Sequence, residues 1–167
     1  DRMCAYLKER WEKPGSRYHV MKEMFACLHK LEVLSADWPK KVRHYEKVLF
    51  GGGRKQYEAL HQYRMSDKIA EQLLSYFIYV YFAGAVYDGM PYSKVKLAVI
   101  STMLIEDMVC AKAAEKGQLS FEAITDVAHS YAREVEHSDL NLQRLSIMFR
   151  HQKCFHIGRL CGALLEW

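Results

Sequence analysis

Apolar residues recur at three- and four-residue steps along most of the chain, which is the spacing of one face of an α-helix. Strand-like alternation is nearly absent. The stretch from residue 16 to 34 shows the helical spacing most clearly, through Val20, Met24, Cys27, Leu28, Leu31 and Leu34. The pattern therefore predicts an all-α fold.

Glycine, proline and small polar residues divide this pattern into segments, as expected of helix caps and turns. The predicted helices cover residues 16–34, 38–50, 54–64, 67–88, 93–116, 121–137 and 138–149. The glycines at 51–53 follow a helix and lack the spacing of a phosphate-binding loop, so we interpret them as a turn. Without a repeat or a clear linker, residues 1–167 are predicted to form a single-domain bundle of about six to eight helices.

Residues 73–87 form the longest apolar stretch, and it includes Ser75, Gly84 and four tyrosines. A bilayer-spanning helix needs about 20 apolar residues. We therefore predict a buried core helix here, and no membrane association.

Five cysteines are scattered without metal-binding spacing, which favours a reducing cytoplasm and predicts no metal site. The net charge is +4, with a basic excess in the first 68 residues. The chain lacks the dense Lys/Arg clusters that phosphate-tracking proteins use, so nucleic acid is not expected as a partner.

Three stretches, in this order, carry a resemblance to a known family. They are Lys30-Leu31-Glu32-Val33-Leu34 followed by Asp37-Trp38-Pro39, then Leu74 to Phe82 (LSYFIYVYF), then Tyr131 to Ser138 (YAREVEHS). Together they resemble the C-terminal part of the flagellin lysine-N-methylases. Because the chain starts at Asp1 and opens directly into a helix-like segment, we expect a C-terminal fragment of a longer protein.

This resemblance implies methyl transfer from S-adenosylmethionine to the ε-amine of flagellin lysines, with flagellin as the partner. The family also has a cysteine-rich N-terminal region that resembles iron–sulfur modules, and this region is missing here. Because cluster chemistry requires several closely spaced thiolates, the domain is expected to recognise the substrate or support the site rather than complete it. The missing region is then its second partner.

The helix predicted at 121–137 has two sides. Its apolar stripe contains Ile124, Val127, Ala128, Tyr131 and Val135, and its opposite side contains Asp126, His129, Arg133, Glu136 and His137. The polar side has two interpretations: a solvated surface, or one wall of a cleft in which an arginine holds a carboxylate or phosphate and a glutamate orients a histidine.

A lysine methyltransferase must present its amine as a neutral nucleophile, a task that suits carboxylates and tyrosine hydroxyls. The predicted catalytic residues are Glu136, His137 and Asp88, and the predicted substrate-binding residues are Arg133, Tyr87 and His129. Tyr87 also suits a core or cap position, and Asp88 suits a turn before glycine. Glu106 and Asp107, inside an otherwise apolar helix, form a weaker candidate pair.

Two other functions fit the sequence. Glu58 with His61 and Glu134 with His137 match the Glu-x-x-His step of a ferritin-like di-iron bundle, although this motif also needs two inward glutamates from other helices. A noncatalytic helical interaction module is the second alternative. Apolar residues of the tail are then expected to dock on the missing region: Phe155, Ile157, Leu160, Leu164, Leu165 and Trp167.

Overall fold

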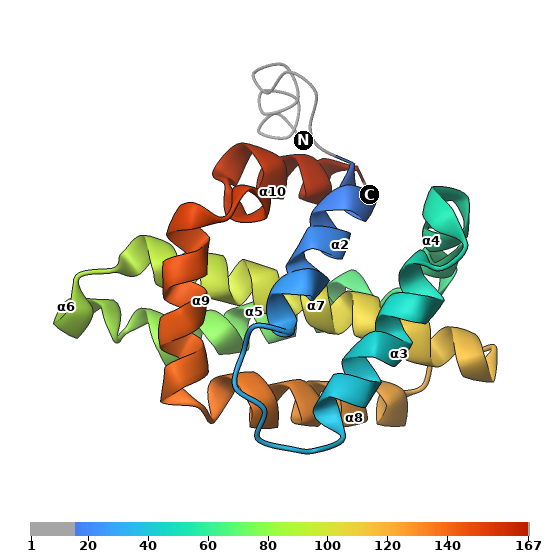
Figure 1. Cartoon of the computed structure of the whole chain (residues 1–167), viewed down its shortest axis with the longest axis horizontal. Coiled ribbons are helices and arrows are strands. Elements are labelled where there is room, and N and C mark those ends of the chain that lie inside the picture. Colours follow the sequence, from blue (N-terminus) through green and yellow to red (C-terminus); the bar gives the residue numbers. More distant parts are fainter. Residues whose placement is uncertain (1–15, 167) are drawn as a thin grey trace.

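The computed structural model describes residues 16–166, which fold into helices without a β-strand. The α-helices of this range are α2 (Arg17–Leu28), α3 (Trp38–Phe50), α4 (Gly53–Leu60), α5 (Asp67–Phe82), α6 (Ala85–Asp88), α7 (Pro91–Lys116), α8 (Phe121–Tyr131), α9 (Asp139–His151) and α10 (Ile157–Leu165). Shorter turns are the 3-10 helices η1 (His61–Tyr63) and η3 (Lys153–Phe155) and the π-helix η2 (Ala132–Glu136). The predicted all-α, single-domain bundle is confirmed, and α6 is its one very short helix (Figure 1).

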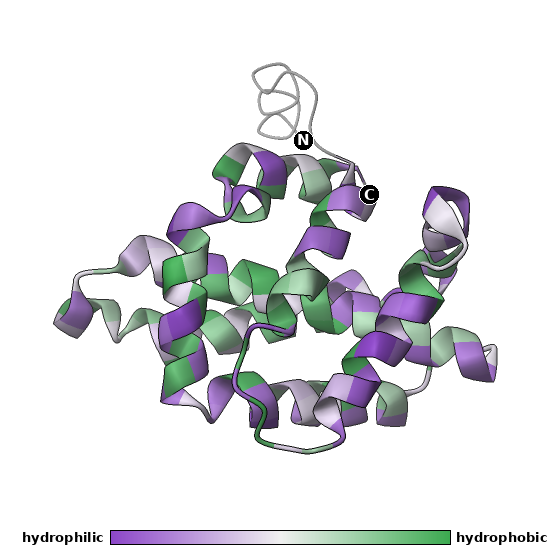
Figure 2. Ribbon diagram, viewed as in Figure 1, coloured by the Kyte–Doolittle hydropathy of each residue, from purple (hydrophilic) through white to green (hydrophobic). Residues whose placement is uncertain are grey.

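Helix α7 is the centre of the bundle, and α2, α3, α5, α8 and α9 all pack against it (Figure 1). Its middle is largely hydrophobic and its C-terminal end is hydrophilic (Figure 2). Ala98, Met108 and Val109 are completely buried. The middle of α7 is buried on every side from Met103 to Ala111, and such a segment is stable in water only when other helices cover it.

The prediction of a buried core helix over residues 67–88 is wrong. Helix α5 ends at Phe82, the short α6 follows, and within α5 only Phe77 is fully buried. One side of α5 packs on α7, but the described helices leave its C-terminal half uncovered. We call the large apolar side chains exposed there the α5–α6 surface: Tyr76, Ile78, Tyr79, Val80, Phe82, Val86 and Tyr87.

Helix α2 is shorter than predicted, because it ends at Leu28 rather than near residue 34. The chain after it is held by tertiary hydrogen bonds from Asn141. The side-chain oxygen of Asn141 accepts from the Glu32 N–H (2.6 Å), and its amide nitrogen donates to the carbonyls of Glu32 (3.0 Å) and Glu134 (2.7 Å). These bonds satisfy backbone groups that another helical turn would otherwise pair.

Two serine hydroxyls cap helices. The Ser120 hydroxyl accepts from the Ala123 N–H at the start of α8 (3.1 Å), and the Ser138 hydroxyl accepts from the Asn141 N–H at the start of α9 (3.2 Å). Ser66 is at the equivalent position of α5 but makes no such bond.

Replacing Ser120 by alanine is expected to lower the free energy of unfolding by about 1 kcal/mol, because an N–H of the first turn loses its acceptor. Urea unfolding of the purified variant measures this loss. Ser66→Ala is the matched control and should cost clearly less. Equal losses in the two variants would contradict this assignment of the caps.

The C-terminal tail does not present the continuous apolar surface that was predicted for docking. Phe155 and Leu160 are buried within the bundle, where α10 and η3 pack on α2. Ile157 and Leu164 remain partly exposed, and Trp167 lies outside the described residues. In the described part of the chain, no helix has both the length and the apolar character that crossing a bilayer requires.

Candidate functional site

The segment from Tyr131 to Ser138 contains a π-helical turn, in which the His137 N–H bonds to the Ala132 carbonyl (3.1 Å). A π-turn inserts a residue into an α-helix and often occurs at functional sites. Tyr131 and Val135 are buried as predicted, and the charged Glu134 between them is buried too. Its carboxylate accepts from the Leu34 N–H (2.9 Å) and so fixes the loop after α2.

Glu136 contacts α5. One of its carboxylate oxygens accepts hydrogen bonds from the hydroxyls of Tyr76 (3.1 Å) and Tyr81 (3.0 Å). Burial, and then the Glu136 carboxylate, raise the pKa of both phenols above their usual value of 10. Both tyrosines therefore remain neutral donors, and Glu136 ties the π-turn to the edge of the α5–α6 surface.

The other predicted residues of this helix lie elsewhere. Arg133 and His129 line a polar groove of ≈ 520 Å³ between α3 and the α7–α8 pair. His137, at the end of the π-turn, is exposed. The Lys112–Asp126 ion pair (2.8 Å) lies in the same groove. Arg133 and Glu136 therefore belong to different environments, and the contacts of Glu136 are with two tyrosines of α5.

Tyr87 and Asp88 are the last two residues of α6, just before the turn that leads into α7. The Asp88 carboxylate pairs with Lys94 (2.8 Å) and accepts from the Met90 N–H (2.9 Å). The hydrogen bond from Lys94, and then that from Met90, hold the pKa of Asp88 below its ordinary value. Tyr87 is 92% exposed. The predicted catalytic residues Asp88 and Glu136 are thus held by separate sets of contacts.

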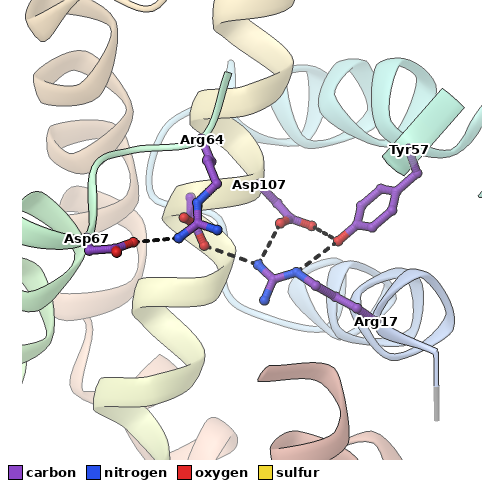
Figure 3. A network of polar contacts seen from close by, with 6 residues as sticks. Arg17, Tyr57, Arg64, Asp67 and Asp107 are labelled. Carbon is purple, nitrogen blue, oxygen red and sulfur yellow. Dashed lines mark hydrogen bonds and ion pairs between the residues drawn. The ribbon is translucent and has the colours of Figure 1, made fainter. Parts of the chain in front are cut away.

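The largest group of buried charges lies between α2, α4 and α7, and Figure 3 shows it from close by. Arg17 Nη2 contacts the carboxylates of Asp107 (3.0 Å) and Glu106 (3.3 Å). Arg17 Nε donates to the Tyr57 hydroxyl (3.3 Å), which in turn donates to Asp107 (2.7 Å). Exposed fractions of 2% for Arg17 and 1% for Asp107 show that water screens this network little.

Burial changes the protonation equilibria around this network. It raises the pKa of Glu106, and the neighbouring Arg17 guanidinium only partly opposes this shift. Burial is also the main cause of the raised pKa values of Tyr57 and Cys110, with the Asp107 carboxylate second in both cases. A buried carboxyl group with a raised pKa that faces a cleft is a recognised feature of binding and catalytic sites.

A cleft of ≈ 290 Å³ adjoins the network. The charged residues along it are Arg17, Arg64, Glu71 and Glu106, and the remaining lining residues are Ala70, Leu74, Val99, Thr102, Met103 and Leu164. Helices α5 and α7 form its two long walls, and α2 and α10 contribute one residue each. Apolar walls with a few converging polar groups are typical of small-ligand sites.

The sequence was compared with known protein families. Residues 3–163, nearly the whole chain, match the family described as the FliB lysine N-methylase C-terminal domain. The chain belongs to this family. Searches of curated proteins and of solved structures found no match. The resemblance inferred from the three sequence stretches is thereby confirmed, and the family name associates this lysine N-methylase domain with protein lysine methylation.

A metal centre finds no support in the part of this FliB-family domain that the structure describes. Within residues 16–166, no three His, Cys, Asp or Glu side chains are placed to hold a metal ion together. The residues that suggested a di-iron bundle make other contacts. Glu58 pairs with Arg54 on the surface (2.6 Å), and Glu134 binds the backbone of Leu34.

The sequence contained one signal for the buried network, the adjacent carboxylates Glu106 and Asp107 in the middle of a long apolar helix. They were a weaker candidate pair, and the structure shows both buried, because α2 and α4 cover them. Arg17 gave no signal of its own, since one arginine near the start of an amphipathic helix is common. Its partners lie about 90 residues away in the sequence.

Glu106 predicts a specific pH dependence of stability. Burial raises the pKa of Glu106 above its ordinary value of 4.5, so the folded state favours the protonated side chain. The stability that this gives is fully present below pH 4.5 and is lost as the pH rises through the raised pKa. Glu106→Gln keeps the side chain neutral at all pH values. We expect urea unfolding to show a smaller loss of stability in this variant than in the wild type as pH increases from 4.5 towards neutrality. A variant with the same pH profile as the wild type would rule out this role of Glu106.

Proposed function

We propose that this domain recognises flagellin within an enzyme that methylates flagellin lysines, and that it supports the reaction site rather than completing it. Membership of the FliB lysine N-methylase family provides the reaction class. The α5–α6 surface is the observation that carries the recognition role. Seven large apolar side chains are exposed there, and residues 72–87 contain no charged side chain.

An apolar surface of this kind favours a protein partner over water. Exposed apolar patches that include several aromatic residues mark protein-binding sites, and tyrosine is enriched among the residues that dominate binding energy. Tyr79 and Tyr87 are 86% and 92% exposed, so both rings are free to pack against a bound protein. Tyr87 thus keeps the substrate-binding role that we predicted for it.

Of the three residues predicted to be catalytic, we retain a role only for Glu136, and we assign it a positioning role. Its carboxylate orients the hydroxyls of Tyr76 and Tyr81 at the edge of the α5–α6 surface.

We further propose that Arg133 and His129, in their separate polar groove, contact acidic groups of the same partner. Arginine forms paired hydrogen bonds with carboxylates.

We place neither the methyl donor in the cleft beside the buried network nor the iron–sulfur cluster among the described residues. A cleft of ≈ 290 Å³ is at the lower limit of small-ligand pockets, which measure about 300–1,000 Å³. It has no aromatic side chain to stack on the base of S-adenosylmethionine. Iron–sulfur clusters are held by four cysteines, and the described residues contain no metal-binding group. We therefore derive no step of methyl transfer through either group in this domain.

The double variant Tyr79→Ser with Tyr87→Ser tests the recognition role. We expect its affinity for monomeric flagellin to be at least about tenfold lower, because removing two exposed aromatic anchors costs more than about 1.4 kcal/mol of binding free energy. Biolayer interferometry with immobilised flagellin measures the dissociation constant.

Phe121→Ser is the matched control for this variant, since Phe121 is 75% exposed on α8, outside the α5–α6 surface. Its affinity for flagellin should equal that of the wild type, and all variants should keep the wild-type melting temperature. Unchanged affinity in the tyrosine double variant, or an equal loss in Phe121→Ser, would refute recognition through the α5–α6 surface.

A further inference from the structure

A pocket of ≈ 420 Å³ lies where the start of α7 meets the end of α9. Its lining residues with polar or aromatic side chains are Tyr92, Ser93, Lys96, Phe149, Arg150 and His156. It shares no lining residue with the cleft beside the buried network or with the polar groove of Arg133 and His129. The pocket is therefore a separate feature, and the proposed function makes no use of it.

The formal charges on the pocket walls are all positive. Lys96 of α7 and Arg150 of α9 are cations, and no Asp or Glu lines the pocket. Arg150 also borders a neighbouring hollow with Asp88 and Asp139, but Asp88 pairs with Lys94 instead (2.8 Å). Among the described residues, neither Lys96 nor Arg150 forms an ion pair with a carboxylate. The excess of positive charge thus comes from the lining residues themselves.

Lys96 is a buried cation, with an exposed fraction of 6%. Its ammonium group donates to the Phe149 carbonyl in the last turn of α9 (2.8 Å) and lies 4.5 Å from the centroid of the Tyr92 ring. Both partners carry only partial charges, whereas buried lysines are normally paired with a full negative charge. Burial lowers the pKa of Lys96, and no carboxylate offsets this shift. An ammonium group has three donors, so Lys96 has further donors for an anion in the pocket.

We propose that this pocket binds a dianionic phosphate group. Lys96 and Arg150 donate charged hydrogen bonds to the phosphate oxygens, which are the strong kind. Ser93 lies three residues before Lys96 on the same side of α7 and adds its hydroxyl. Arg150 is exposed and contacts the sulfur of Met90, a weak acceptor that a phosphate oxygen replaces. Two cations match the charge of a phosphate group near neutral pH, whereas a carboxylate leaves one cation unbalanced.

The phosphate group comes either from inorganic phosphate or from a small organic phosphate monoester. The size of the pocket favours the monoester, because ≈ 420 Å³ is within the range of about 300–1,000 Å³ that is typical of small-ligand sites. Pro91 and Tyr92 also line the pocket and offer apolar surface to the organic part of such a ligand. The site does not depend on the recognition of flagellin that is proposed above.

Three probes test the proposal on the whole chain: phenyl phosphate, inorganic phosphate and benzoate. Benzoate has the aromatic ring but a single negative charge. Amide resonances of Ser93, Lys96 and His156 report binding in NMR titrations at constant ionic strength. We expect phenyl phosphate to shift these resonances with an affinity at least about tenfold higher than that of benzoate, which corresponds to about 1.4 kcal/mol. Tighter binding of phenyl phosphate than of inorganic phosphate supports a monoester as the ligand, and equal binding supports inorganic phosphate.

Substitutions locate the site. Arg150→Gln is expected to weaken phenyl phosphate about fivefold or more, because one charged hydrogen bond is lost. Arg150 is exposed, so this variant should keep the wild-type melting temperature. Lys96→Met removes the buried ammonium group and is expected to weaken phenyl phosphate about tenfold or more. Arg43→Gln is the matched control, because Arg43 is an exposed arginine on α3, outside the pocket, and its affinity should equal that of the wild type.

Three results would overturn the proposal. The first is equal affinity for phenyl phosphate and benzoate, which would show that the second negative charge adds nothing. The second is unchanged phenyl phosphate affinity in Arg150→Gln, or an equal loss in Arg43→Gln, which would place the anion elsewhere on the surface. The third is the absence of a saturable shift at Ser93, Lys96 and His156 with either phosphate probe up to about 10 mM.

Discussion

Replacing Arg17 by alanine is expected to lower the free energy of unfolding by about 3–5 kcal/mol, the largest single effect predicted for this domain. The substitution leaves the carboxylates of Glu106 and Asp107 buried without their guanidinium partner. It also removes the donor to the Tyr57 hydroxyl. Because Arg17, Tyr57 and Asp107 belong to α2, α4 and α7, the contacts of three helices are weakened together. Urea unfolding followed by circular dichroism measures the loss.

Two further variants show whether the loss comes from the unpaired charges. Adding Asp107→Asn to Arg17→Ala removes one buried charge, so the double variant should recover part of the lost stability. Arg54→Ala breaks an exposed ion pair with Glu58 and should leave stability unchanged within experimental error. If Arg17→Ala were as stable as Arg54→Ala, the network would not hold the three helices together.

The second large effect is expected at Asn141, which is completely buried. Asn141→Ala removes all three hydrogen bonds that the side chain makes to the backbone of Glu32 and Glu134. Each bond contributes about 1 kcal/mol, and the buried backbone groups lose their partner. The free energy of unfolding should therefore fall by about 3 kcal/mol. Amide hydrogen exchange should also become faster at Glu32.

Gln143→Ala is the matched control, because Gln143 is an exposed amide two residues away on the same helix. We expect this variant to keep wild-type stability and exchange rates. If Asn141→Ala and Gln143→Ala lost similar amounts of stability, α9 would tolerate neither change. That result would contradict the specific role of Asn141 in holding the loop after α2.

Much of the fold was predictable because helix periodicity and caps are local properties of the sequence. Ile124, Val127 and Tyr131 face the core as their spacing predicts, and serine hydroxyls cap α8 and α9, as is typical of small polar residues at helix boundaries. Local patterns do not show which helices cover one another. Residues 73–87 therefore suggested a buried helix, although nothing among the described residues covers most of its C-terminal half.

Tertiary contacts explain the other differences. The apolar spacing through Leu31 continues as in a helix, but Asn141 and Glu134 bind the backbone there and end α2 early. The π-turn after Tyr131 rotates Glu134 inwards, which a wheel of 100° per residue does not anticipate. Long-range pairs such as Arg17 with Asp107 leave no periodic trace in the sequence.

The candidate site was only partly predictable for the same reason. Glu136 lies at the edge of the α5–α6 surface, and Tyr87 lies within it. Arg133 and His129 line a separate groove, and Asp88 holds a turn. The cleft between α5 and α7 depends on helix packing that no single motif encodes. Membership of the FliB lysine N-methylase C-terminal domain family associates the chain with lysine methylation, and helix packing gives the domain its surfaces.

Amide hydrogen exchange of this domain with and without monomeric flagellin tests the central claim, recognition through the α5–α6 surface, most directly. We predict slower exchange in residues 76–88 on addition of flagellin, and unchanged exchange in α4. Protection confined to α3 and α4, or no protection in residues 76–88 at saturating flagellin, would contradict it.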